Sequence, residues 1–328
     1  MNHHLVSRRQ LLKSAGCAAA VAMYGRFATA ADSTTTASTQ PATRPWTGPI
    51  IDIHQHTTYR GRSDAALFHH QACMGVTQTV LLPAGTAMNS PSTLKGIANG
   101  LYAGAGPIDT VLPIVKSHSR QYFFFANEVP DFPEARKNIE QQLKAGAKGI
   151  GEQKFNLPCD SKEMELIYSL AQEYDVPILM HFEHQMFNTG YENFGKVLAK
   201  WPKVTFIGHA QTFWANIDAA IKQQAGYPKG KVVAGGLTDK YLTDYPNLFA
   251  DMSAGSGLNA LIRDEEHARG FIQRHYKQMM FGSDCADNAG FGPTCSGSSM
   301  ISAIVRLSPS KDVTQQLLHD NAKALLKL

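Results

Sequence analysis

Short apolar runs recur along the chain from residue 49 onward, and several of them lack the strict polar alternation of a half-exposed strand. Runs of this kind are typical of strands that are buried on both faces. The predicted strands are Ile50–His54, Gln78–Leu82, Tyr122–Ala126, Gly149–Lys154, Pro177–His181, Val204–His209, Leu248–Ser253 and Gln278–Asp284.

Between these runs, apolar and charged residues at helical spacing predict helices. The predicted helices are Glu134–Ala145, Ser161–Tyr174 with Asp160 as its N-cap, Phe194–Trp201, Asn216–Gln224 and Thr314–Leu328. Eight alternating strand and helix units predict an α/β protein with a (β/α)8 barrel. The alternative, an open doubly wound sheet, needs a phosphate-type glycine fingerprint at its first turn, which the chain lacks. The segment Thr86–Pro107, rich in Gly, Ala, Ser and Asn, is expected to be a mobile loop over the barrel mouth.

The chain divides into three parts. Residues 1–30 read as a twin-arginine export signal, because SRRQLLK precedes a short apolar stretch and Ala28-Thr29-Ala30 fits a cleavage site. That stretch is too short to span ~30 Å of hydrocarbon, so we expect no membrane anchor after cleavage. Residues 31–48, rich in Thr, Ser, Ala and Pro, predict a flexible linker, and residues 49–328 predict one barrel domain. We therefore expect the twin-arginine export machinery as a partner and a periplasmic or secreted mature protein.

The charge balance argues against nucleic acid as a partner. The chain has 31 Lys and Arg against 27 Asp and Glu, and four of those bases lie in the predicted signal. The remainder is formally neutral and carries no basic cluster of the kind that a nucleic-acid-binding face needs. The cysteines after residue 30 show no zinc-finger spacing and are read as mainly structural thiols, with Cys285 and Cys295 as a candidate disulfide pair after export.

Metal-type residues stand at the ends of four predicted strands: His54 and His56, His181, His209 and Asp284. Residues two apart in a strand point to the same side, so His54 and His56 can reach one ion, with Asp52 one step deeper. Barrel enzymes place their sites at this carboxyl end of the strands. Imidazole together with carboxylate suits zinc and similar divalent ions. The sequence therefore predicts a divalent metal site inside the barrel.

The fourth strand is ambiguous, because Glu152 and Lys154 fall on one side of it. Glu152 could bridge two ions, Lys154 could bridge them if its amine were carboxylated, or the two side chains could form an ion pair near substrate. We favour Glu152 as a ligand and Lys154 close to the substrate or to Glu152.

Several other polar residues are not expected to be metal ligands. Surface positions are expected for His69 and His70. For Asp251 packing or capping is expected, with a place in the pocket as the alternative. Arg60 and Arg62 are expected to be solvated, or to meet an anionic substrate. Glu183 shares a strand side with His181 and is a candidate to support it.

Several motifs together resemble the amidohydrolase superfamily, in its family-2 branch of small metal-dependent hydrolases and decarboxylases. They are IIDIHQH, FFFANEVPDFPEA, GAKGIGEQKF, VPILMHF, VTFIGHA, NLFADMSAGSG, MMFGSD and LLHDNAKALLKL. The resemblance implies that His54, His56 and Asp284 bind a first ion, that His181 serves one or both ions, and that His209 binds a second ion or polarises the substrate. It leaves the role of Glu152 open, because superfamily members differ on this strand.

The expected function is a metal-dependent hydrolase that activates water to attack a small lactone, ester or amide. Asp284, His209 and Lys154 are the expected catalytic residues, and one or two ions are expected, zinc first with manganese as the alternative. A non-oxidative decarboxylase on the same barrel is the alternative reaction, with Lys154 or Arg60 available to bind the substrate carboxylate. A non-catalytic binding protein is the third hypothesis. A small-molecule substrate is the expected partner, and the oligomeric state, homo-oligomers included, stays open.

Overall fold

The computed structural model describes residues 44–86, 96–101, 104–221 and 226–328, all within the unit Pro41–Leu328. The predicted signal and the first part of the predicted linker, residues 1–43, lie outside the described residues. Of the helices in the described ranges, none is both long enough and apolar enough to cross a membrane.

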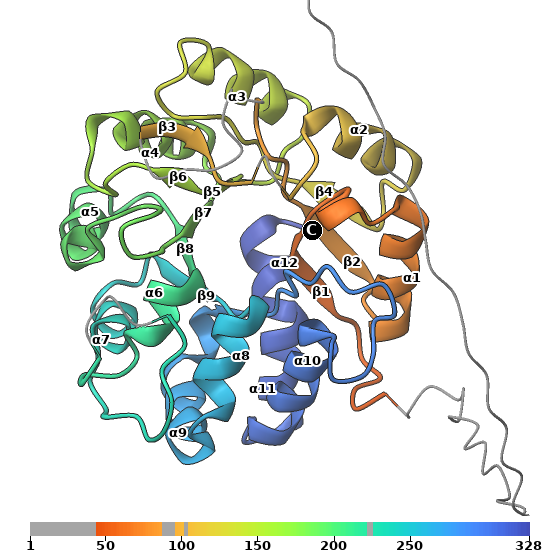
Figure 1. The fold of residues 1–328 in the computed structure, drawn as a ribbon, viewed down its shortest axis with the longest axis vertical. Coiled ribbons are helices and arrows are strands. Elements are labelled where there is room, and N and C mark those ends of the chain that lie inside the picture. Colours follow the sequence, from red (N-terminus) through yellow and green to blue (C-terminus); the bar gives the residue numbers. More distant parts are fainter. Residues whose placement is uncertain (1–43, 87–95, 102–103, 222–225) are drawn as a thin grey trace, which may run out of the picture. The chain divides into compact units, whose positions relative to one another are not determined.

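Eight parallel strands alternate with helices and form a ring (Figure 1). These strands are β1 (Ile51–Gln55), β2 (Gln78–Leu81), β4 (Tyr122–Phe124), β5 (Ile150–Gln153), β7 (Ile178–His181), β8 (Phe206–His209), β9 (Leu248–Asp251) and β10 (Met279–Met280). All eight strands predicted from the sequence are thereby confirmed, each within a few residues of its predicted ends.

The ring closes through two contacts between separately paired strand groups. One group has the order β1-β2-β4 and the other β10-β9-β8-β7-β5, with every pairing parallel. A bridge between Ala126 and Ile150 joins β4 to β5. The backbone N–H of Ile53 donates to the carbonyl of Phe281 at 3.2 Å and joins β1 to β10. The predicted (β/α)8 barrel is therefore the observed fold.

Most helices surround the ring and follow its strands, whereas the last one, α12, lies across it (Figure 1). The helices are α1 (Asp64–Met74), α2 (Ile108–Ser117), α3 (Ala135–Lys144), α4 (Lys162–Tyr174), α5 (Phe194–Lys200), α6 (Ala210–Ala215), α7 (Leu237–Asp244), α8 (Ala254–Ile262), α9 (Glu265–His275), α10 (Ser296–Leu307), α11 (Lys311–Gln315) and α12 (Asn321–Leu326). Short 3-10 turns cover Tyr59–Gly61, Tyr191–Asn193 and Tyr276–Gln278, and a π-helical turn covers Gln316–Asp320.

Three helix predictions need correction. The helix after β8 begins at Ala210, directly after the strand, and not at Asn216. The cap of α4 is Ser161, whose hydroxyl accepts from the N–H of Met164, and not Asp160. The C-terminal helix is interrupted by the π-helical turn at Gln316–Asp320.

Apolar side chains fill the inside of the ring and are covered at one end by the last helix. The inner cluster joins buried residues of β1, β2, β7, β8 and β10, together with Leu82 and Phe125, to Ala322 and Leu326 of α12, which lies across the ring in Figure 1. A larger apolar cluster lies between the strands and the outer helices. Because one end of the barrel is plugged by apolar packing, the polar side chains of the strands gather at the other end.

The sequence predicted a loop over the whole of Thr86–Pro107, but part of this segment is a strand. Its residues Gly96–Asn99 form β3, which pairs antiparallel with β6 (Phe155–Asn156); residues 87–95 and 102–103 lie outside the described part. At the other end of the domain, the last residues of the predicted linker contact the barrel. The Arg44 guanidinium donates to the carbonyl of Ala72 at 2.8 Å, and Trp46 packs on the outer core.

Candidate metal centre

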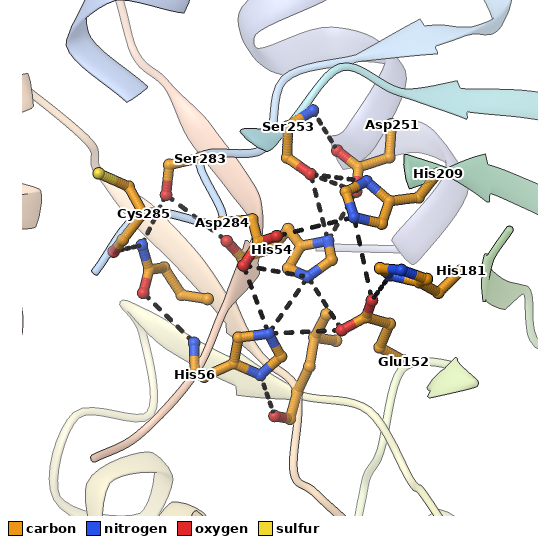
Figure 2. Close-up of polar contacts among 12 residues, drawn as sticks. His54, His56, Glu152, His181, His209, Asp251, Ser253, Ser283, Asp284 and Cys285 are labelled. Atoms are coloured by element: carbon orange, nitrogen blue, oxygen red, sulfur yellow. Dashed lines mark hydrogen bonds and ion pairs between the residues drawn. The ribbon is translucent and has the colours of Figure 1, made fainter. Parts of the chain in front are cut away.

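Side chains from the carboxyl ends of β1, β5, β7, β8 and β9, and from the residues after β10, converge on one point (Figure 2). The parallel register of β7 and β8 sets His181 directly beside His209. The imidazoles of His54, His56, His181 and His209 and the carboxylate of Glu152 are all buried, and the Asp284 side chain is only 12% exposed. The structure thus places the six residues that the sequence analysis assigned to a metal site next to one another.

Hydrogen bonds fix which ring nitrogen faces inward for His54 on β1 and for His56 directly after it. Nδ1 of His56 lies 2.7 Å from the carbonyl oxygen of Leu82, which can only accept, so Nδ1 carries the proton. Nδ1 of His54 lies 2.7 Å from Oδ2 of Asp251, and the same reasoning applies. In the neutral rings both Nε2 atoms therefore present lone pairs, and they face each other at 3.3 Å.

The histidine on β8 follows the same pattern. Ser253 Oγ donates to Asp251 at 2.8 Å, which leaves it to accept from Nδ1 of His209 at 3.0 Å. Nε2 of His209 then presents its lone pair to the centre. Nε2 of His181 lies 3.1 Å from the carboxylate of Glu183 and its Nδ1 contacts Glu152 Oε1, so both ring nitrogens face a carboxylate. Coordination of an ion through Nδ1 would leave the ring proton on Nε2, toward Glu183. The rings of His54, His56 and His209 are thus each oriented by one nitrogen and offer the other as a ligand.

Acceptors face acceptors at the middle of the cluster. Glu152 Oε2 lies 3.4 and 3.5 Å from Nε2 of His54 and His56, and Asp284 Oδ1 lies 3.8 and 3.6 Å from the same atoms. Asp284 Oδ1 is buried and has no hydrogen-bond partner. With neutral rings, lone pairs packed together in this way need a cation between them. Burial lowers the pKa of His54, but the carboxylates of Asp284, Asp251 and Glu152 outweigh it and raise this pKa well above its ordinary value, so the acids attract a proton as well as a metal to this point. Imidazole and carboxylate are ligands of zinc and similar divalent ions, so these residues fit a divalent metal.

The two oxygens of Glu152 serve two different ligand sets. Oε2 faces the pair at the end of β1, as above, whereas Oε1 contacts Nδ1 of His181 and lies 3.9 Å from Nε2 of His209. Asp284 also contacts both sets: Oδ1 faces His54 and His56, and Oδ2 lies 3.7 Å from Nε2 of His209. The centre therefore offers two adjoining ligand sets, joined by the carboxylates of Glu152 and Asp284.

Charge interactions hold the acids of the centre ionised. Burial raises the pKa of Glu152, but His181, His54 and Lys154 outweigh it and bring the pKa well below its ordinary value. The pKa of Asp284 is also lowered, because His54 and His56 outweigh the effect of burial. Burial lowers the pKa of His209 to about 4, with His54 and His181 adding to that effect, so this ring is neutral near pH 7.

Several residues of the centre stand just after a strand in a strained backbone conformation. Asp284 has φ +39°, and Ala210 and Ala254, which follow His209 and Ser253, have φ +79° and +60°. A non-glycine residue in this left-handed region costs about 1–3 kcal/mol, and such residues gather at functional sites. Glycine is needed at 282, where a Cβ would lie 2.5 Å from Asp251 and 2.9 Å from His54.

The residues that orient the ligands were largely missed from the sequence. Asp251 and Ser253 hold His54 and His209, yet packing or capping was the first expectation for Asp251, with the pocket second, and Ser253 was not singled out. The sequence did contain a signal for Asp251. Like Asp284, it is an acid at the end of an apolar strand. Asp52 also differs from expectation. Its carboxylate accepts from Gln71 of α1 and from the N–H of Ser283, and pairing of β1 is irregular between Asp52 and Gln55.

Arg62 braces the backbone after Asp284 and is neither solvated nor placed for substrate. It is 5% exposed, and its guanidinium donates to the carbonyls of Cys285 at 2.7 Å and Asp287 at 3.0 Å, and to Gln55 Oε1. Gln55 Nε2 donates to Cys285 as well, at 3.0 Å. These contacts fix the loop that carries Asp284.

The mouth of the centre is lined by polar and aromatic side chains. Lys154 Nζ lies 5.4 Å from the ring centroid of Phe187, which in turn packs edge-on against His181. Lys154 forms no ion pair with Glu152, so that hypothesis is wrong. A cavity of about 570 Å³ opens beside Glu183, His184, Gln211 and Tyr227. Small ligands have room there, within reach of the cluster.

The comparisons agree with this geometry. Residues 104–328 match the family described as Amidohydrolase, and because the match covers more than half of the chain, the chain belongs to this family. The family includes hydrolases and metal-dependent decarboxylases. The matched region begins after His54 and His56, which the fold brings to the centre. No curated protein matches the chain.

Solved structures share the fold at low sequence identity. An uncharacterised TIM-barrel protein from Bordetella bronchiseptica has 16% identity and a TM-score of 0.57, over 85% of this chain and 99% of that one. A protein from Agrobacterium tumefaciens has 13% identity and a TM-score of 0.56, over 85% and 95%. A 2,6-dihydroxybenzoate decarboxylase from Rhizobium has 11% identity and a TM-score of 0.50, over 86% and 99%. These likenesses support the barrel.

Proposed function

We propose that this chain is a divalent-metal-dependent hydrolase of small carbonyl compounds such as lactones, esters or amides. The observation that carries the proposal is Glu152, whose two oxygens meet two separate histidine pairs. A carboxylate shared in this way could hold two ions at once, and paired ions would supply activation of water. Zinc is the first expectation from the ligand set, and manganese is the alternative.

When bound, a divalent cation would supply Lewis-acid chemistry, polarising a carbonyl and lowering the pKa of water toward about 7. Asp284 is suited to accept the proton of the attacking water, because Oδ1 is buried and has no hydrogen-bond partner. It would then deliver that proton to the leaving group. His209 presents a lone pair and not an N–H to the centre, which supports a ligand role over polarising the carbonyl. Lys154, at the mouth, would hold an oxygen of the substrate.

Decarboxylation is the second candidate, and the comparisons support it better than hydrolysis. Among the solved structures described above, the one with a stated reaction is a decarboxylase of 2,6-dihydroxybenzoate, and the family includes such enzymes. In that reaction Asp284 would first take a proton from solvent water and then pass it to the ring carbon that loses carbon dioxide. Lys154 or Arg60 would bind the carboxylate.

One labelling experiment separates the two reactions. The metal-loaded protein is offered lactones, esters and amides, and separately hydroxybenzoates and unsaturated acids, in water enriched in oxygen-18 and in deuterium. Hydrolysis puts one solvent oxygen into the acid product. Decarboxylation puts one solvent hydrogen on the carbon that loses carbon dioxide, and no solvent oxygen. Binding without turnover of either substrate class would contradict the proposal and leave the third hypothesis, a binding protein.

We also propose that residues 1–30 direct export through the twin-arginine pathway, which carries folded proteins. Replacing Arg8 and Arg9 together by lysine should retain the chain in the cytoplasm of a bacterial host that has this pathway. Unchanged appearance of the mature chain in the periplasmic fraction would contradict it. Full-length mass of the exported chain would contradict cleavage after Ala30.

A further inference from the structure

A second group of ligand-type side chains lies behind the loop that carries Asp284. The thiols of Cys285 and Cys295, Nε2 of His70 and the thioether of Met74 meet there, and all four residues are buried. His70 and Met74 lie one turn apart on α1, Cys295 caps α10, and Cys285 follows Asp284 directly. His70 was expected at the surface, but its ring is 0% exposed.

From this cluster we propose a second metal site that is distinct from the histidine and carboxylate centre. It would hold one thiophilic ion, Zn²⁺ or Cu⁺, through Cys285, Cys295 and His70, with Met74 as the fourth ligand. Thiolate and thioether sulfurs select these ions over the hard cations.

The spacing of the ligand atoms matches tetrahedral coordination. Two sulfurs at about 2.3 Å from a tetrahedral ion lie about 3.8 Å apart, and a sulfur and an imidazole nitrogen lie about 3.6 Å apart. The two cysteine sulfurs are separated by 3.9 Å, Cys295 Sγ and His70 Nε2 by 3.4 Å, and Cys295 Sγ and Met74 Sδ by 3.8 Å. The three Cys and His ligand atoms all lie within 4.8 Å of one another.

Hydrogen bonding alone accounts poorly for the buried imidazole. Nδ1 of His70 has no hydrogen-bond partner, and Nε2 faces only thiols, which are weak donors and acceptors. Buried polar groups are normally paired, and coordination through Nε2 would supply the missing interaction for that atom. The cysteines are free thiols, so the predicted disulfide between Cys285 and Cys295 is absent.

Such a site would tie three segments together. It would join α1, the start of α10 and the loop of Asp284, which Arg62 and Gln55 already hold from the other side through the carbonyl of Cys285. The ion would therefore be structural, because four protein ligands leave no open position for substrate.

Cobalt binding tests the proposal without relying on activity. The full chain, reduced and stripped of metal, is titrated with Co²⁺, and thiolate-to-cobalt charge-transfer absorption is recorded. The histidine and carboxylate centre has no sulfur, so its cobalt cannot give this band. We expect the band in the parent, its loss in Cys295→Ser, and its retention in Cys73→Ser, a matched control on α1. Serine can still cap α10 at 295, where the sulfur now accepts from the N–H of Ser298.

Elemental analysis then identifies the ion. After loading with Zn²⁺, Cys295→Ser should hold one ion per chain fewer than the parent and Cys73→Ser. In a separate titration with Cu⁺ under reductant, Met74→Leu should weaken binding at least tenfold if the thioether is a ligand of copper. Absence of the cobalt band in the parent would overturn the proposal, as would equal zinc content in the parent and Cys295→Ser. The third outcome concerns the parent protein. If its mass without reductant is two hydrogens lower and it binds no ion through thiolates after reduction, Cys285 and Cys295 form a redox-active disulfide and not a metal site.

Discussion

Oδ2 of Asp251 lies 2.7 Å from Nδ1 of His54, and this hydrogen bond decides which nitrogen of His54 faces the metal centre. Both groups are fully buried, at the ends of β9 and β1. A carboxylate can only accept, so it holds the proton on Nδ1 and leaves the lone pair on Nε2. The same carboxylate accepts from Ser253, whose oxygen orients His209. One acid thus orients ligands on two strands.

Replacing that acid by its amide should weaken metal binding. In Asp251→Asn the side chain can rotate to offer an N–H to Nδ1 of His54, which would move the ring proton to the inward nitrogen. Loss of such an orienting partner typically costs 10–100-fold in affinity. Competition of zinc against a chelator would measure the change, with Asp239→Asn on α7 as the control. Unaltered zinc affinity in Asp251→Asn would show that the carboxylate does not set the tautomer.

Asp284→Asn should reduce turnover by roughly 10²–10⁴-fold, because it removes the proton acceptor while conserving shape. Asp287→Asn is the matched control in the same loop, where Oδ2 of Asp287 accepts from the N–H groups of Ala289 and Gly290. Rates are measured with metal content and circular dichroism recorded for each variant. Near-parental turnover in folded, metal-loaded Asp284→Asn would remove Asp284 from the mechanism.

Glu152→Gln should lower the metal content from two ions per chain to one, because an amide is a poor bridge between cations. Glu183→Gln is the matched control, since Glu183 touches His181 only through the outward nitrogen, at 3.1 Å. Elemental mass spectrometry after loading with zinc would measure the number of ions per chain in the parent and in each variant. A parent that binds a single ion, or a Glu152→Gln chain that still binds two, would exclude a bridge through Glu152.

The strands were predictable from the sequence because burial on both faces gives continuous apolar runs. The site residues were predictable because a polar residue at the end of such a run is unusual. That reasoning located His181, His209 and Asp284, and period-two alternation added His56 to His54. It failed for Asp52, since the irregular pairing of β1 between Asp52 and Gln55 breaks the alternation. Nothing local could reveal that Arg62 would meet Cys285, because that contact depends on closure of the ring between its first and last strands.

Arg62→Met should destabilise the domain by about 2–4 kcal/mol, because it leaves buried carbonyls without donors. The carbonyls of Cys285 and Asp287 and the side chain of Gln55 would each lose a partner. Urea unfolding followed by circular dichroism would measure the change. Arg60→Met, two residues earlier and exposed, should change the stability by less than about 0.5 kcal/mol. Equal effects of the two substitutions would mean that Arg62 does not brace this loop.

Asp239 should make the stability of the domain depend on pH in the acid range. Its carboxylate lies 2.6 Å from Nε2 of His275 and 3.1 Å from Arg274. Burial raises the pKa of Asp239, but the hydrogen bonds and charges of these two partners outweigh it, so the pKa lies below its ordinary value of 3.8. A carboxyl with a depressed pKa stabilises the folded state above its unfolded pKa, and this contribution is lost as the pH falls through the folded pKa.

Asp239→Asn should therefore unfold more easily than the parent at pH 7, by roughly 1–2 kcal/mol, and the difference should shrink below about pH 4. Urea unfolding at pH 7, 5, 4 and 3.5 would follow the difference. Asp244→Asn, at the end of the same helix and exposed, controls for a change of charge on α7. A gap between Asp239→Asn and the parent that stayed constant down to pH 3.5 would place the destabilisation in lost packing and not in the ionised carboxylate.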